Sequence, residues 1–319
     1  MKAKICSISP ETSRVKLYRL VAAESNELPP YTPGAHISVK IDSHGPGSRT
    51  ITRSYSICNS PAERDCYLIA VQREDNGNGG SRYIHENWKV GDIIEFDGPR
   101  NYFKMDQSGK ENILIAGGIG ITPIVCMAGA MVDSGIPFQL HYVARDEEAM
   151  ALTARVLEVA GSAAKLWFDH GKPEKGIPID SIITEWCNGK HVYVCGPSGL
   201  IKAVRETCQV KSWPEEMVHF ELFYGTTQES EKSISVKLMR SGKVVDVPND
   251  KSILDALLQA GVEVDYDCRI GECGSCAVKV LGGRPLHRDV CLTTKERESG
   301  ECMCVCVSWA ESPEIALDL

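Results

Sequence analysis

The spacing of hydrophobic residues divides the chain into regions with different expected folds. In the first hundred residues, apolar runs at 15–23, 36–41, 66–72 and 92–98 alternate with turn-rich stretches, and helical periodicity is weak. This pattern predicts an antiparallel β-barrel. After Phe103, apolar strands alternate with amphipathic helices, which predicts a doubly wound parallel α/β sheet. The strands of that sheet are expected at 112–118, 138–144, 164–171, 191–197 and 218–225.

A polar segment of small residues follows the last of these strands and indicates a linker. From Ile234 onward, a hairpin pattern over 234–248 precedes a helical pattern over 252–261 and a strand at 277–283. The chain is also long enough for more than one hydrophobic core. We therefore expect folded domains at 1–102, 103–225 and 234–319, with a linker at 226–233.

Composition and charge narrow the class of protein. Acidic residues outnumber basic ones by 43 to 35, the formal net charge is −8, and no long basic run occurs. A nucleic-acid partner is therefore not expected. No stretch is apolar enough for a membrane span, and the first twenty residues lack the pattern of a secretory signal. We expect a cytoplasmic protein whose fourteen cysteines remain thiols.

Half of these cysteines lie between positions 268 and 306. Cys268, Cys273, Cys276 and Cys306 are separated by four, two and twenty-nine residues, which is the spacing of the ligands of a plant-type [2Fe-2S] cluster. A zinc site would more commonly show two short cysteine pairs. Cys304 lies close enough to Cys306 to be an alternative fourth ligand.

Two short motifs in the first region carry groups that can bind a phosphorylated cofactor. Alternation along a strand points Arg53 and Tyr55 to the same face, where a guanidinium can hold phosphate and a ring can flank a flavin. A turn with Gly80 and Ser81 precedes an expected helix, whose first amides can approach a phosphate. An ordinary barrel strand and an ordinary helix cap are the structural alternatives. The candidate contacts are Arg53, Ser54, Tyr55, Ser56, Gly80 and Ser81.

Glycines follow the first strand of the expected parallel sheet and open a helix. This context lets a pyrophosphate approach the backbone, although the sequence is not a GxGxxG fingerprint. Cys195 ends another strand on the carboxyl edge, where doubly wound sheets bind ligands. A structural glycine turn and a buried small residue are the alternatives. The candidate contacts for a nicotinamide cofactor are Gly117, Gly118, Gly120, Thr122, Pro123, Gly196 and Pro197.

Together these motifs resemble the phthalate dioxygenase reductase family, which includes vanillate demethylase reductases. The resemblance covers essentially the whole chain and rests also on IAGGIGITPI, VYVCGPSGLI, HFELF, GGRPLHRDVCLT and the terminal ALDL. It implies the domain order flavin barrel, nicotinamide domain and plant-type ferredoxin, the last with an α+β β-grasp fold. It also implies FMN, NADH and a [2Fe-2S] cluster as cofactors. Trp309 is a departure, because an arginine is more usual there, and it could alter the docking surface.

The resemblance further places Cys195 beside the reacting carbon of the nicotinamide, and Glu221 and Phe223 over the flavin face. It implies a Rieske-type non-haem iron oxygenase as the electron acceptor. A hydride carries two electrons and a [2Fe-2S] cluster accepts one, so a flavin between them is required. The alternatives are an FAD- and NADPH-using ferredoxin-type reductase, a redox sensor without turnover, and a zinc-stabilised interaction protein.

A preference for NADH over NADPH is expected from the ends of the second and third strands of the parallel sheet. Arg145 could bind a 2′-phosphate, but the three acidic residues at 146–148 repel one. Asp169 is better suited to ribose hydroxyls, with a solvated turn aspartate as its alternative. The preference also leans on the resemblance. We expect a monomer, because one chain already carries every electron-transfer site.

Overall fold

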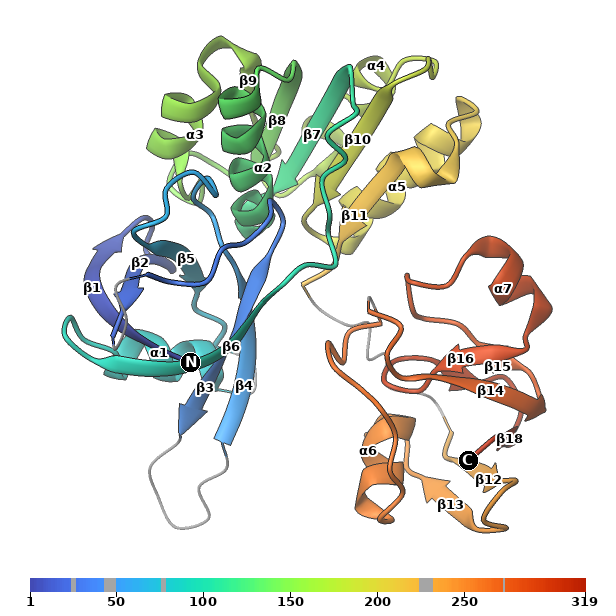
Figure 1. The fold of residues 1–319 in the computed structure, drawn as a ribbon. Coiled ribbons are helices and arrows are strands. Elements are labelled where there is room, and N and C mark those ends of the chain that lie inside the picture. The colour runs from blue at the N-terminus through green and yellow to red at the C-terminus, as the bar shows by residue number, and fades with distance from the viewer. Residues whose placement is uncertain (24–26, 43–49, 76–78, 224–231, 272) are drawn as a thin grey trace. The chain divides into compact units, whose positions relative to one another are not determined.

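The computed structural model describes residues 1–23, 27–42, 50–75, 79–223, 232–271 and 273–319. These form two compact units, Met1–Glu221 and Leu222–Leu319, which are coloured from blue to yellow and from yellow to red in Figure 1. Most of the expected linker, 226–231, lies outside the described residues. Within the described segments, no helix combines the length and the apolar character that crossing a bilayer requires.

The first unit begins with an antiparallel sheet in the order β4-β3-β6-β1-β2-β5. A bridge between Ile57 and Ile69 joins its two outer strands and closes the sheet into the expected barrel. Tyr18 and Phe96 fill the interior without solvent exposure, and α1 (Gly80–Asn87) buries Ile84 against this core. The strands are β1 (Lys2–Pro10), β2 (Val15–Ala22), β3 (His36–Asp42), β4 (Thr50–Ser56), β5 (Tyr67–Gln72) and β6 (Ile93–Arg100).

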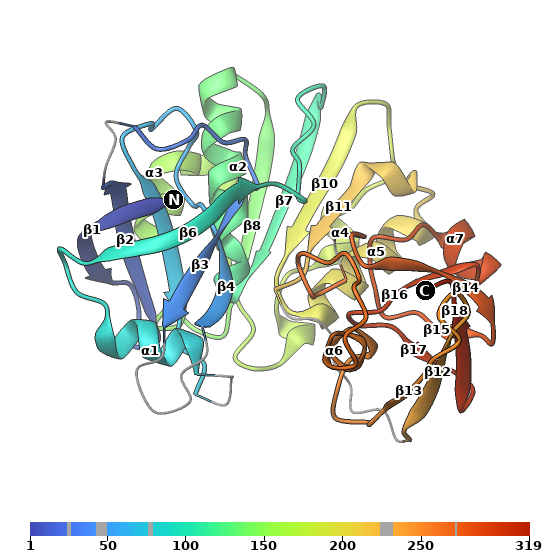
Figure 2. The same ribbon diagram turned by 60° about the horizontal axis from the view of Figure 1, so that its bottom comes forward.

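The rest of the first unit is the expected parallel sheet, in the order β11-β10-β7-β8-β9. Figure 2 shows α2 and α3 on one face of this sheet and α4 and α5 on the other. The strands are β7 (Glu111–Gly117), β8 (Phe138–Ala144), β9 (Ala164–Phe168), β10 (Lys190–Cys195) and β11 (Val218–Glu221). The helices are α2 (Ile121–Ser134), α3 (Thr153–Ala160), α4 (Ile179–Ile182) and α5 (Ser198–Val210), with 3₁₀ turns η1 (Gly118–Gly120), η2 (Gly161–Ala163), η3 (Pro173–Lys175) and η4 (Glu215–Met217).

The apolar runs explain this layering. Strand β10 is buried along its whole length, because parallel strands have helices on both faces. Helix α2 is buried from Ile121 to Met131 and ends at Gly135, whose φ of 67° suits a glycine at a helix end. The parallel strands therefore end together at one side of the sheet, called here the carboxyl edge, where the loops after β7, β8, β9 and β10 meet.

The second unit is an α+β domain with a sheet in the order β13-β12-β18-β14-β16. The expected hairpin is formed by β12 (Ile234–Leu238) and β13 (Val244–Val247), and β18 (Glu314–Leu317) pairs with β12 in parallel. Helix α6 (Ile253–Gln259) is capped by the Ser252 hydroxyl, which accepts from the Asp255 amide. The remaining elements are β14 (Ala277–Gly282), β15 (Pro285–Leu286), α7 (Thr294–Ser299), β16 (Cys302–Cys304) and β17 (Trp309–Ala310).

Candidate functional site

The glycine loop after β7 packs directly against the end of β10. A Cβ atom added at Gly120 would lie 2.4 Å from the carbonyl oxygen of Cys195 and 2.7 Å from the amide of Gly196. A Cβ at Gly117 would lie 2.7 Å from Cδ of Pro197. Only glycine permits such a close approach of two backbones. The structure thus brings the two predicted nicotinamide motifs together at the carboxyl edge.

The start of α2 completes this loop. Thr122 is 2% exposed, and its hydroxyl donates a hydrogen bond of 3.0 Å to the carbonyl of Ile119. Pro123 lies in the first turn, where its fixed φ favours a helix. Gly118 has a φ of 53°, and a Cβ there would meet no described atom within 4 Å. The exposed face of the loop is therefore formed by the backbone of Gly118. The buried Thr122 hydroxyl stabilises the turn through its hydrogen bond to Ile119.

Arg145 and Asp169 lie side by side at the ends of β8 and β9. The amide of His170 donates to the carbonyl of Arg145 at 2.9 Å, which links the two loops. The carboxylate of Asp169 accepts from the amide of Gly171 at 2.8 Å, as a turn aspartate does. Arg145 is exposed and Asp169 is half-buried. Both positions are at the carboxyl edge, where the sequence placed them.

A residue of the barrel reaches the same edge. Glu221 at the end of β11 accepts a hydrogen bond from the hydroxyl of Ser56 in β4, with 3.5 Å between the two oxygens. The thiol of Cys195, which is fully buried and lies opposite Glu221 in the strand register, is 4.0 Å from the same carboxylate oxygen. Phe223 lies in the second unit and is half-buried there. Three predicted residues from two sheets therefore form one buried cluster.

Sequence reasoning missed the polar side chains that continue from this cluster along β10 and β11. The ring of Tyr193 stacks on His219 with centroids 4.5 Å apart, and a ring nitrogen of His191 lies 3.0 Å from one of His219. The hydroxyl of Tyr193 accepts from the amide of Asp106. Burial lowers the pKa of His219 to about 4. The sequence does contain a signal for this row of side chains. His191, Tyr193 and Cys195 alternate with valines, so a strand places all three on one face.

The two predicted phosphate-binding motifs of the barrel also meet. A Cβ atom at Gly80 would lie 3.1 Å from Cγ and 3.2 Å from Nε of Arg53, so the arginine crosses the first residue of α1. The hydroxyl of Ser81 accepts from the amide of Glu74 and can still donate its own proton. Arg53 is half-buried, as is Tyr55, which contacts the barrel core. Ser54 points away with its hydroxyl 3.1 Å from that of Ser38. A guanidinium beside a helix amino terminus fits a phosphate.

Three cysteines of the second unit, Cys268, Cys273 and Cys276, lie in a loop whose described residues are 268–271 and 273–276, called here the cluster loop. The amides of Ile270 and Cys273 donate to the sulfur of Cys268 at 3.5 and 3.3 Å, and the amide of Cys268 donates to Cys273 at 3.4 Å. Gly271 and Gly274 have φ angles of 80° and 73°, which allow the tight wrapping. Amides directed at sulfur suit ligands of an iron–sulfur cluster.

The fourth ligand can be judged from the neighbours of each thiol. The thiol of Cys276 contacts both Cys304 and Cys306, and hydrogen bonds from these two lower the pKa of Cys276 to about 3. Cys306 also interacts with Cys268 and with the backbone of Gly271. Cys304 hydrogen-bonds with Cys276 and also lies 3.3 Å from the sulfur of Cys291. The donor set Cys268, Cys273, Cys276 and Cys306 therefore fits a [2Fe-2S] cluster, and Cys304 divides its contacts between Cys276 and Cys291.

Family models match this chain in three segments. Residues 2–105 match an oxidoreductase FAD-binding domain, residues 114–206 an oxidoreductase NAD-binding domain, and residues 236–311 a 2Fe-2S iron-sulfur cluster binding domain. The order of the matches is the order of the barrel, the parallel sheet and the α+β domain. The chain is thus built as an oxidoreductase with flavin, nicotinamide and [2Fe-2S] domains.

Whole-chain comparisons agree with this order. Phthalate dioxygenase reductase from Burkholderia cepacia is 37% identical over 100% of this chain and 97% of its own length. Vanillate O-demethylase oxidoreductase from Pseudomonas sp. strain HR199 is 35% identical over 94% of this chain and 93% of its own. A solved phthalate dioxygenase reductase, described as a modular structure for electron transfer from pyridine nucleotides to [2Fe-2S], superposes with a TM-score of 0.75 at 36% identity, covering 100% and 98% of the two chains. The chain belongs to the phthalate dioxygenase reductase family.

Proposed function

We propose that this protein carries electrons from NADH through FMN to a [2Fe-2S] cluster and on to a Rieske-type non-haem iron oxygenase. The contact between Ser56 and Glu221 carries the proposal, because it joins β4 of the barrel to the carboxyl edge of the parallel sheet. A flavin held by the barrel and a nicotinamide held at that edge then border the same buried side chains. The acceptor is supported by the relatives, whose names include a dioxygenase reductase and a carnitine monooxygenase reductase subunit.

The proposed domains are a flavin barrel at 1–102, a nicotinamide domain at 103–225, a linker at 226–233 and a ferredoxin domain at 234–319. Arg53, Gly80 and Ser81 hold the flavin phosphate, and Tyr55 and the backbone of Ser54 complete the flavin contacts. The nicotinamide cofactor lies along the carboxyl edge. Its proposed contacts are Gly117, Gly118, Gly120, Thr122, Pro123, Arg145, Asp169, Gly196 and Pro197.

When bound, the flavin accepts two electrons as hydride and releases them singly to the cluster. The small, buried thiol of Cys195 leaves room for the nicotinamide ring and keeps water from it. Ser56 and Glu221 form a hydroxyl–carboxylate pair that can hold or move a proton at Oε2 of Glu221. Phe223 is proposed to cover the flavin. The cluster is held by Cys268, Cys273, Cys276 and Cys306.

FMN rather than FAD is proposed because Arg53 and the first turn of α1 supply one phosphate site inside the barrel. The family model for this segment is described as FAD-binding, so identifying the cofactor directly is essential. Heating the purified protein and chromatographing the released flavin should give stoichiometric FMN. Recovery of FAD would overturn this part of the proposal.

NADH rather than NADPH is proposed because the exposed Arg145 is followed by three acidic residues, while Asp169 is the carboxylate beside it. Steady-state cytochrome c reduction with each nucleotide should give a higher specificity constant for NADH. Asp169→Asn should narrow the difference, since an amide repels a 2′-phosphate less than a carboxylate does. A higher specificity constant for NADPH in the unchanged protein would contradict the preference.

We also propose a cytoplasmic monomer. All fourteen cysteines are free thiols in the structure, as a reducing compartment would maintain them. One chain carries the proposed sites for all three cofactors, so catalysis needs no second copy. Light scattering should give a mass close to 35.0 kDa, and a doubled mass would contradict the monomer.

The activity itself is tested by NADH-dependent reduction of cytochrome c. The purified protein should be coloured, its visible spectrum should bleach on addition of NADH, and cytochrome c should be reduced catalytically. A sensor would bleach without turnover, and a zinc-stabilised interaction protein would be colourless. Either result would contradict the proposed function.

A further inference from the structure

Asp289 is a buried carboxylate that belongs to none of the proposed cofactor contacts. Its side chain has 0% exposure, and it lies in GGRPLHRDVCLT, a motif that supplies no proposed ligand. One carboxylate oxygen accepts from the hydroxyl of Ser308 at 2.8 Å, and the other accepts from the amide of Leu292 at 3.2 Å. Burying a carboxylate is costly unless such donors surround it. Asp289 is therefore held in one position from several directions.

The residues beside Asp289 bond to the cluster loop. The amides of Val290 and Cys291 donate to the carbonyl of Gly271 at 2.9 and 3.2 Å. A Cβ atom at Gly271 would lie 2.9 Å from Cα of Asp289, so the two backbones are in direct contact. Gly271 lies between the proposed ligands Cys268 and Cys273. A shift of Asp289 would therefore shift the cluster loop.

Ser308 connects the same carboxylate to the segment that carries the fourth proposed ligand. It lies two residues after Cys306, is 1% exposed, and its amide donates to the carbonyl of Cys304 at 2.9 Å. Its hydroxyl also accepts from the amide of Arg288 at 3.2 Å. Asp289 is thus hydrogen-bonded to Ser308 in the Cys306 segment. The next two residues along the chain are hydrogen-bonded to Gly271 in the cluster loop.

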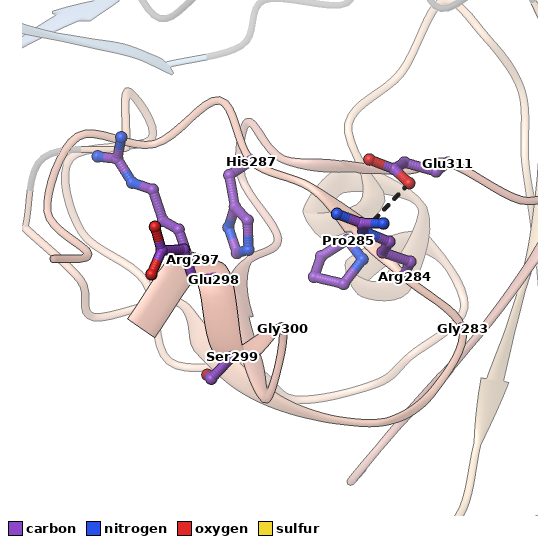
Figure 3. Close-up of a pocket in the computed structure, with 9 residues that line it drawn as sticks. All are labelled: Gly283, Arg284, Pro285, His287, Arg297, Glu298, Ser299, Gly300 and Glu311. Carbon is purple, nitrogen blue, oxygen red and sulfur yellow. Dashed lines mark ion pairs between the residues drawn. The ribbon is translucent and has the colours of Figure 1, made fainter. Parts of the chain in front are cut away.

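The network also reaches a surface pocket lined by Arg284, Pro285, His287, Arg297 and Glu298 among others. In Figure 3, His287 lies between Pro285 and Arg297. A ring nitrogen of His287 lies 3.3 Å from Asp289, and Nε of Arg297 lies 3.8 Å from it. Arg297 makes no hydrogen bond through Nε within the described part of the chain. Arg297 therefore forms an ion pair with the carboxylate but no hydrogen bond to it through Nε.

We propose that Asp289 is a positioning residue for the [2Fe-2S] cluster, an inference that rests on the proposed ligand set. It fixes the cluster loop relative to the Cys306 segment, so that the two parts of the ligand set keep their separation. Its negative charge also opposes the addition of an electron to a nearby cluster. Removing the charge should therefore loosen the ligands and raise the midpoint potential of the cluster.

The test compares Asp289→Asn, Ser308→Ala and the control Glu298→Gln in the full-length holoprotein. Glu298 is exposed and lies next to Arg297 in α7, so its change removes a carboxylate outside the network. The measurements are iron release to a ferrous chelator after reduction, and the cluster midpoint potential by EPR-monitored titration. Asp289→Asn should release iron about 10- to 100-fold faster and shift the potential to a more positive value. Ser308→Ala should speed release without a comparable potential shift, and Glu298→Gln should match the unchanged protein.

Wild-type release and potential in Asp289→Asn would overturn the inference. If that variant accumulates no cluster while its flavin is retained, Ser308→Ala decides, because unchanged iron release there would contradict the network. An unchanged protein that holds no [2Fe-2S] cluster would contradict the proposed function instead. The two failures are therefore distinguishable.

Discussion

The carboxyl edge of the parallel sheet and the cluster loop of the second unit are built in different ways. At the carboxyl edge, the backbones of Gly120 and Cys195 touch, and no side chain separates them. In the cluster loop, thiols converge and amides point at sulfur, with a buried carboxylate behind them. The first site is preformed by packing. The second is a set of ligands whose arrangement depends on contacts from residues far along the chain.

This difference predicts opposite sensitivities. At a site made by backbone contact, a single added carbon should destroy the geometry, whereas most side-chain changes nearby should be tolerated. At a site made by ligands, loss of one ligand side chain should remove the cofactor and leave the first unit, Met1–Glu221, folded. The predictions below test this contrast, from the largest expected effect to the smallest.

Gly120→Ala should have the largest effect. Its Cβ would lie 2.4 Å from a carbonyl oxygen in the end of a buried strand, which cannot move as a flexible side chain would. We expect a loss of more than about 4 kcal/mol in the free energy of unfolding or loss of NADH oxidation altogether. Thermal unfolding measures the loss of stability, and NADH-dependent reduction of ferricyanide measures the loss of NADH oxidation.

Gly199→Ala is the matched control, because a Cβ there meets no described atom within 4 Å. It lies in α5, where alanine should stabilise the helix by about 0.5–1 kcal/mol. If Gly120→Ala had the same unfolding temperature and the same rate of ferricyanide reduction as Gly199→Ala, the carboxyl edge would not be a site built by backbone contact.

Cys306→Ser should abolish the [2Fe-2S] signal while flavin reduction by NADH continues at close to its normal rate. Cys304→Ser should keep the signal, because the ligand spacing and the contacts of Cys306 with Cys268 and Gly271 favour Cys306 as the fourth ligand. Visible and EPR spectra of the two variants provide the comparison. Loss of the cluster in Cys304→Ser but not in Cys306→Ser would show that the ligand assignment is reversed.

Much of this arrangement could be predicted from the sequence, because it depends on local patterns. Alternating apolar strands predicted the barrel, and the spacing of Cys268, Cys273 and Cys276 predicted the thiol loop. The three domain types are confirmed by the fold and by the family models. Neither the barrel nor the thiol loop requires the order of strand pairing to be known in advance.

Contacts between distant residues could not be predicted in the same way. Asp289 and Ser308 are nineteen residues apart and meet only because β15 pairs with β17. Trp309, a position where the resemblance suggested an altered docking surface, lies in β17 with 5% exposure. Burial in this segment depends on tertiary pairing rather than on the residue type.

Arg53→Ala should weaken flavin binding by about 10- to 100-fold, since hydrogen bonds to a charged group contribute about 1.5–3 kcal/mol. The fold should be retained, because Arg53 is only half-buried and lies beside the first turn of α1. Flavin retention after dialysis, followed by titration of the apoprotein with FMN, measures the effect. Arg64→Ala, at an exposed arginine of the same barrel, is the control. Equal retention in both variants would remove Arg53 from the phosphate site.

Acidification should destabilise the parallel sheet by a smaller amount. Burial lowers the pKa of His219 and of His141 to about 4 each, whereas the unfolded chain takes up these protons near pH 6.5. Stability is therefore fully present above about pH 6.5 and is lost as the pH falls toward 4. We expect a decline of up to about 2.5 kcal/mol for each histidine by pH 4.5, measured by urea unfolding. His219→Gln should flatten this decline, and an unchanged slope would contradict the role of the buried ring.

Anaerobic rapid mixing with NADH tests the central claim most directly, since it follows the electrons through both sites in one experiment. Visible spectra should show flavin reduction first, and freeze-quenched samples should then show the EPR signal of a reduced [2Fe-2S] cluster. In Cys273→Ser the flavin should be reduced at a similar rate and the EPR signal should be absent. A cluster that stays oxidised in the unchanged protein, with excess NADH and fully reduced flavin, would contradict the proposed electron path.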